Sequence, residues 1–134
     1  MRVRSESINN GRIPRASSGA YHRGMTQTAL HSLESWRDAL AAHPRVLLFK
    51  HSPICPVSTA AHSEWERFRA GQPELDTLFV DVIRDKPTAR GLASECGVAH
   101  ASPQVILFVD GAPVWNASHG EITAGALTQA WESA

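Results

Sequence analysis

Three short, mainly apolar runs constrain the fold of this 134-residue chain more than any other feature. They span residues 45–50, 77–83 and 104–109, and each is predicted to be a strand; the first is continuous in the way that a central strand buried on both faces is. A sheet made of such strands must be covered by helices on both sides. The runs therefore predict an α/β fold, in a chain whose length suits one domain.

Apolar residues at helical spacing occupy the segments around these runs. The predicted helices span Thr26 to about Ala42, Pro56 to about Ala70, residues 89–96 and residues 122–131. The second of them is expected to keep Glu64, Glu66, Arg67 and Arg69 mostly in water. A turn signal at Asp110-Gly111 leads into a fourth strand at residues 113–117.

The connections between the strands predict how the strands pair. A helix joins the first two strands, so these should be parallel with a right-handed crossover. A tight turn joins the last two strands, so these should be antiparallel. We expect a mixed four-stranded sheet flanked by helices.

Composition excludes several classes of protein. Thirteen basic and thirteen acidic residues balance, which gives no support for nucleic-acid binding, and no apolar run approaches the ~20 residues of a membrane helix. Two cysteines without a secretory signal indicate a reducing cytoplasm. Residues 1–24 carry five arginines against Glu6 alone, so we expect a disordered basic tail before a domain over residues 25–134.

The segment Lys50-His-Ser-Pro-Ile-Cys-Pro-Val-Ser58 carries the strongest chemical signal. Pro56 suits the first position of a helix, and Cys55 then becomes the N-cap, where free N–H groups and the helix dipole stabilise a thiolate. Ser58 stands where a second cysteine would complete Cys-x-x-Cys; its hydroxyl can hydrogen-bond the thiolate but cannot form a disulfide. With His51 as a further candidate neighbour, the segment predicts a monothiol site.

A second segment, Ala101-Ser-Pro-Gln104, comes directly before the third apolar run. If that strand runs antiparallel beside the first, its start lies next to the first strand's end. Pro103 would then face Cys55 across the same edge of the sheet.

Three blocks in this order, KHSPICPVS, ASPQVILFVDGAPVW and ASHGEIT, resemble the monothiol bacilliredoxin family, the thioredoxin-like proteins of the bacillithiol system. The resemblance covers about residues 26–131 and implies a thioredoxin-like fold. It implies that Cys55 is the redox nucleophile, that Ser58 replaces a resolving cysteine and that Pro103 is a cis-proline. Ser102 would then offer backbone groups to the main chain of the bound thiol. The family more often has threonine before the cysteine, where this chain has Ile54.

The implied activity is that of a thiol–disulfide oxidoreductase. The Cys55 thiolate would remove a small thiol, bacillithiol by resemblance, from mixed disulfides of client proteins, and a separate small-thiol reductant system would regenerate it. Bacillithiol is then a co-substrate, and no resident cofactor is expected. Two other classes stay open: an iron–sulfur cluster carrier of the monothiol glutaredoxin type, and a non-catalytic thioredoxin-like adaptor.

The other cysteine and the histidines carry weaker signals. Cys96 shares a helical stripe with Leu92 and Ala93, which favours core packing, with resolution of a Cys55 adduct as the alternative. His119, in the third block, could flank the site or only turn the chain. His43, His62 and His100 are interpreted as surface or loop residues, and no metal-ligand spacing is present.

Overall fold

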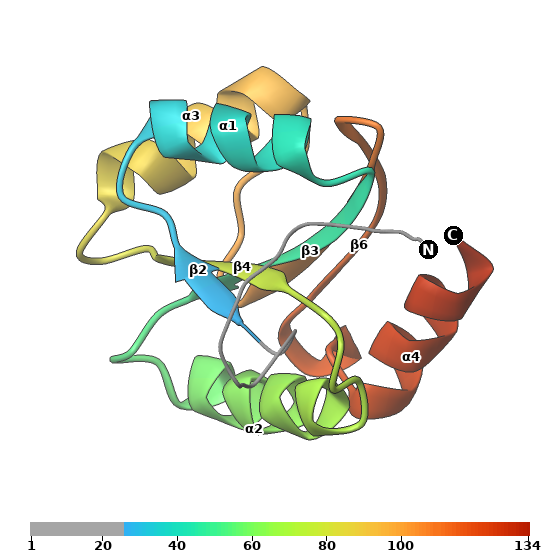
Figure 1. Cartoon of the computed structure of the whole chain (residues 1–134). Coiled ribbons are helices and arrows are strands. Elements are labelled where there is room, and N and C mark those ends of the chain that lie inside the picture. Colours follow the sequence, from blue (N-terminus) through green and yellow to red (C-terminus); the bar gives the residue numbers. More distant parts are fainter. Residues whose placement is uncertain (1–25) are drawn as a thin grey trace, which may run out of the picture.

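The computed structural model describes residues 26–134, so the tail predicted at residues 1–24 lies outside the described part. This part forms a five-stranded sheet with helices on both faces (Figure 1). The strands are β2 (Gln27–Ala29), β3 (Arg45–His51), β4 (Thr77–Asp81), β5 (Gln104–Val109) and β6 (Ala112–Ser118). The helices are α1 (Leu33–Ala42), α2 (Pro56–Ala70), α3 (Lys86–Cys96) and α4 (Ala124–Ser133), with a 3₁₀ turn, η2 (His119–Glu121), before α4.

Strand β3 lies in the middle of the sheet, whose order is β2-β4-β3-β5-β6. It pairs in parallel with β4 and antiparallel with β5, and β5 pairs antiparallel with β6. The expected mixed sheet is confirmed, and so is the pairing of the first and third apolar runs. In the β3–β5 register Lys50 lies opposite Gln104, which brings the end of β3 and the start of β5 to one edge.

The N-terminal helix was predicted too long, and the sheet has one more strand than predicted. Residues 27–29 pair in parallel with the start of β4, and the N–H of Leu30 donates to the carbonyl of Phe79 at 2.8 Å. Helix α1 begins only after Ser32, whose side chain forms a capping box with Ser35. Because Leu30 and the helical Leu33 both pack toward the same core, the two elements imitate one helical stripe.

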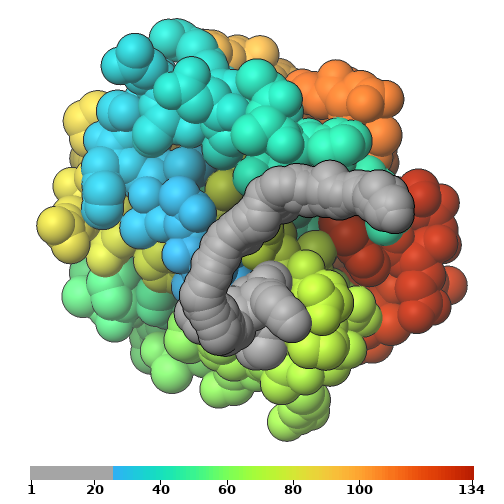
Figure 2. Space-filling model, in the orientation of Figure 1, coloured from blue at the N-terminus to red at the C-terminus, as the bar shows by residue number. Residues whose placement is uncertain are grey.

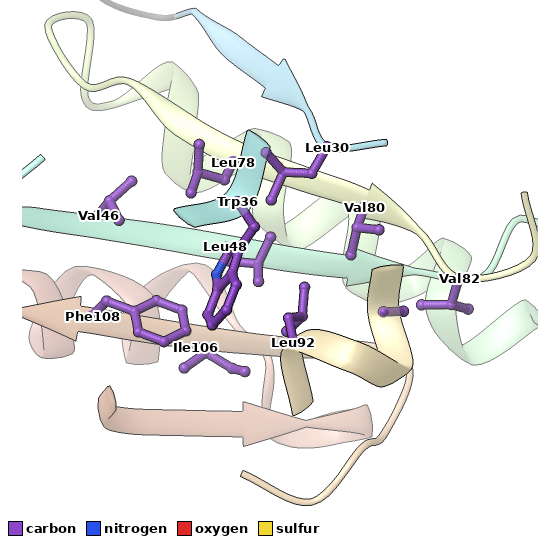
Figure 3. Close-up of a cluster of buried hydrophobic side chains, with 11 residues drawn as sticks. Leu30, Trp36, Val46, Leu48, Leu78, Val80, Val82, Leu92, Ile106 and Phe108 are labelled. Atoms are coloured by element: carbon purple, nitrogen blue, oxygen red, sulfur yellow. The ribbon is translucent and has the colours of Figure 1, made fainter. Parts of the chain in front are cut away.

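Two separate hydrophobic cores lie on the two faces of the sheet. One lies under α1 and α3, where Trp36 stands at 6.2 Å from Phe108 (ring centroids) and reaches over β3 toward β5 (Figure 3). The other lies under α2 and α4 and includes Phe49, Trp65 and Leu127. In the space-filling view α1 lies at the top of the molecule, α2 at the bottom and α4 at the right (Figure 2). Among residues 26–134, no helix is long and apolar enough to cross a membrane.

Helix α2 has the predicted bounds, but one of its charged residues is not in water. Arg69 is only 8% exposed, because the last turn of α2 packs against the start of β4. Its Nε donates to Thr77 Oγ1 at 3.1 Å and its Nη1 to Glu66 at 3.0 Å. A buried guanidinium with partners on two elements therefore fixes the C-terminal end of α2 to the sheet.

Candidate active site at the start of helix α2

Cys55 is the N-cap residue of α2, with extended backbone dihedrals, and Pro56 occupies the first turn of the helix. The carbonyl of Cys55 accepts the N–H of Thr59 at 3.0 Å, and the N–H of Cys55 donates to the carbonyl of Ser52 at 3.2 Å. The side chain makes no capping bond, and the residue is partly exposed. The thiol thus lies at the positive end of the helix dipole, in a residue that is partly exposed to solvent.

Ser58, one turn into α2, is completely buried. Its hydroxyl accepts the N–H of Ser52 at 2.9 Å and lies 2.7 Å from Nδ1 of His51. This differs from the expectation that Ser58 bonds to Cys55, because no hydrogen bond joins the two side chains within residues 26–134. The Ser58 hydroxyl therefore links the loop after β3 to the first turn of α2.

His51, the last residue of β3, lies in an aromatic group. Its ring centroid is 4.9 Å from that of His62 on α2, 5.5 Å from Phe49 and 5.8 Å from Phe79 on β4. The sequence placed His62 on the surface, but its ring packs on His51 and Phe49. The spacing of Ser58 and His62, four residues apart on one helix face, was the signal that could have found it.

The surroundings of His51 favour its neutral form. Partial burial lowers the pKa of His51 below its ordinary value, and the neighbouring His62 lowers it further. Asp81, opposite His51 in the β3–β4 pairing, acts the other way. The first two effects outweigh the third, so the ring enters the network with Ser58 mainly as neutral imidazole near neutral pH.

The second half of the site comes from the loop before β5. The Ser102–Pro103 peptide bond is cis, as the resemblance implied, and Pro103 is buried. The N–H of His119 donates to the carbonyl of Pro103 at 3.1 Å, while the His119 side chain is exposed. Ser102 is partly exposed, and its backbone groups bond no other residue in the described part of the chain. These groups are therefore available to form further hydrogen bonds.

The N-cap cysteine follows the end of β3 and the cis-proline precedes the start of β5, and these two strand ends lie at one edge of the sheet. This arrangement agrees with the comparison with protein families. The model of the family "Monothiol bacilliredoxin BrxC" matches residues 28–127, which is most of the chain. The chain belongs to the monothiol bacilliredoxin family. Membership supports a thiol oxidoreductase role for the protein.

Solved structures similar to this bacilliredoxin have the thioredoxin fold. A protein described as a candidate oxidoreductase with a thioredoxin fold matches at 29% identity and a TM-score of 0.74, over 79% of this chain and 94% of that one. A thioredoxin mutant from Halobacterium salinarum matches at 21% identity and 0.67, over 85% and 95%. Oxidised mitochondrial thioredoxin 3 from Saccharomyces cerevisiae matches at 18% and 0.64, over 80% and 94%.

A buried lysine next to the site was missed in the sequence of this bacilliredoxin. Lys50 is fully buried, and its Nζ donates to Gln104 Oε1 at 2.9 Å, while Gln104 Nε2 donates to the carbonyl of Ala99 at 3.1 Å. Burial lowers the pKa of Lys50 to about 8; Cys96 acts the other way, and Arg90 adds to the lowering. The pair joins the end of β3 to the loop before Pro103. The sequence signal that could have indicated this buried pair was a lysine at the end of an apolar run, close to Gln104 in the predicted pairing of the two strands.

The second cysteine of this bacilliredoxin lies on the other layer. Cys96 ends α3, is partly buried and packs against the core under α1 and α3, whereas α2 covers the opposite face. Its Sγ lies 3.9 Å from the carbonyl of Ala93. Both cysteines are free thiols. Among the described residues, no three His, Cys, Asp or Glu side chains form a group that could hold a metal ion.

Proposed function

We propose that this bacilliredoxin removes a low-molecular-weight thiol from mixed disulfides on client proteins, with Cys55 as the nucleophile. The observation that carries the proposal is the helix start itself: an accessible N-cap cysteine is followed, one turn later, by a buried serine. A serine at this position cannot resolve a disulfide on Cys55. The adduct must therefore leave the enzyme by reaction with another molecule.

The reaction consists of two thiol–disulfide exchanges. In the first, the Cys55 thiolate attacks the small-thiol sulfur of the client disulfide, a new S–S bond forms on Cys55, and the client cysteine leaves as a thiolate. In the second, a thiolate of the small-thiol reductant system attacks that adduct and restores Cys55. Each exchange breaks one S–S bond and forms another, so the client is reduced and the reductant is oxidised.

The surroundings of Cys55 support a protein as one substrate. Ile54 is 78% exposed and Val57 46% exposed, so apolar side chains flank the sulfur on both sides in the chain. The open backbone groups of Ser102 can pair with an extended client segment. We propose bacillithiol as the small thiol, by resemblance to the family, and the cytoplasm as the location; the proposal includes no nucleic-acid or membrane partner.

Intact-mass spectrometry with a bacillithiolated client tests the proposal. The reduced protein is expected to gain one bacillithiol on Cys55 while the client returns to its free thiol. Cys55→Ser should abolish the transfer, because serine is a far weaker nucleophile, and Cys96→Ser should retain it. Transfer by Cys55→Ser would refute the role of Cys55, and a product lighter by two hydrogens that requires Cys96 would refute the monothiol mechanism.

A further inference from the structure

The loop that carries the cis-proline, residues 98–103, lies between the end of α3 and the start of β5. Two hydrogen bonds hold its backbone to other residues in the described part of the chain. The carbonyl of Pro103 accepts the N–H of His119 at 3.1 Å, and the carbonyl of Ala99 accepts Nε2 of Gln104 at 3.1 Å. One end of the loop is therefore held by a backbone group after β6, and the other end by a side chain.

The orientation of the Gln104 amide follows from its other partner. Gln104 is 3% exposed, and its Oε1 accepts Nζ of the fully buried Lys50 at 2.9 Å. A lysine ammonium can only donate, so the amide oxygen faces it and the NH2 group points toward the carbonyl of Ala99. The reversed amide would set donor against donor at Lys50 and acceptor against acceptor at Ala99, which is costly for buried groups. Lys50 therefore aims the amide of Gln104 at the loop.

This chain of hydrogen bonds connects the two halves of the candidate site. Lys50 and Gln104 lie opposite each other in the β3–β5 register, so backbone pairing brings their side chains together. Strand β3 leads into the segment that carries Cys55, and Gln104 directly follows Pro103. The side chain of Gln104 then reaches back across the loop to Ala99. The position of the loop relative to β3 thus depends on two buried polar side chains.

We infer that Lys50 and Gln104 are positioning residues that hold the cis-proline loop in the form that binds the main chain of a client protein. This inference rests on the proposed function, in which the backbone groups of Ser102 pair with an extended client segment. Without the bond to Ala99, binding of the client would have to order the loop, which costs affinity. The reaction at the sulfur should not change, because no hydrogen bond joins either side chain to Cys55 in the described part of the chain.

Gln104→Glu distinguishes positioning from stability. The carboxylate still accepts from Lys50 and forms a charge pair with it, but it has no N–H for the carbonyl of Ala99. We expect KM for a peptide with a bacillithiolated cysteine to rise about tenfold, with kcat and the alkylation rate of Cys55 by iodoacetamide unchanged. If the network served stability alone, KM would equal that of wild type. Gln129→Glu, at an exposed position of α4, is the matched control and should change none of these quantities.

Hydrogen exchange measures the loop without any client. The amide of His119 donates to the carbonyl of Pro103, so its protection reports whether the loop keeps its place. Relative to the amide of Leu107 in β5, exchange at His119 should be about tenfold faster in Gln104→Glu and in Lys50→Met than in wild type. Unchanged exchange in both variants, or a Gln104→Glu KM equal to that of wild type, would overturn the inference. If the wild-type protein never reduces the peptide, the proposed function itself fails, whatever the exchange shows.

Discussion

One hydroxyl, that of Ser58, links three parts of the site. It joins the loop after β3, the ring of His51 and the first turn of α2 in a space from which water is excluded. Sequence reasoning correctly identified Cys55 as the N-cap but directed Ser58 toward the wrong partner. Spacing along a helix shows which residues share a face, but only the packed structure shows which acceptor lies closer.

The burial of Lys50 should make the free energy of unfolding depend on pH. Its folded pKa of about 8 lies below the unfolded value of 10.5, so between these values the unfolded chain binds more protons and stability rises with pH. Relative to Lys50→Met, the wild-type free energy of unfolding should gain about 3 kcal/mol from pH 7.5 to 10.5. Chemical denaturation at several pH values measures this gain.

The matched control for that experiment is Lys86→Met. Lys86 is exposed at the start of α3, where its ammonium is hydrated in both the folded and the unfolded chain. Its difference from wild type should stay constant with pH. A flat difference for Lys50→Met as well would mean that the Lys50 ammonium keeps its hydration in the folded protein.

At the scale of elements, the bounds of helices and strands were predicted best where residues that end an element coincide with the apolar pattern that buries it. Helix α2 and strand β5 have the predicted bounds, because Pro56 and Gly71 delimit the helix and a continuous apolar run matches the buried strand. Strand β2 was missed because three residues at a sheet edge carry no period of their own. Their pairing with β4 decides their conformation, and one sequence segment does not contain that information.

Replacement of two glycines by alanine should change the free energy of unfolding in opposite directions. Gly97 ends α3 with φ +78, a conformation that alanine adopts only at a cost of roughly 1–2 kcal/mol. Gly125 lies in the first turn of α4, with no atom within 4 Å of an added Cβ. Gly97→Ala is expected to lower the free energy of unfolding by about 1 kcal/mol, and Gly125→Ala to raise it by about 0.5 kcal/mol. Urea denaturation distinguishes the two signs; equal effects would contradict this account of α3.

At the scale of the whole molecule, the sheet separates a purely hydrophobic core on one face from the candidate site on the other. The core under α1 and α3 contains no residue of the Cys55–Ser58–His51 group, which lies with α2 on the other face. The buried Lys50–Gln104 hydrogen bond joins the end of β3 to the start of β5, next to the loops that carry the site. We therefore expect the core under α1 and α3 to contribute to stability alone, and the face covered by α2 to affect both stability and the reactivity of Cys55.

Leu92→Ala tests this separation. Leu92 of α3 is fully buried in the core under α1 and α3, and its truncation should cost roughly 2–5 kcal/mol in the free energy of unfolding. Under conditions where the variant remains folded, the alkylation rate of Cys55 should stay within about twofold of wild type. A larger loss of rate, with the circular dichroism spectrum unchanged, would show that the first face also controls the thiol.

The pairing of β5 beside β3 has a consequence for a chain that is still being synthesised. Cys55 and its helix emerge well before Ser102 and Pro103, which reach the same edge only when Gln104 lies opposite Lys50. Until then the segment that carries the cysteine lacks the loop that completes the candidate site. Under the proposed function, a partly synthesised chain would therefore expose Cys55 before it could select a client, and selectivity would require the last strands.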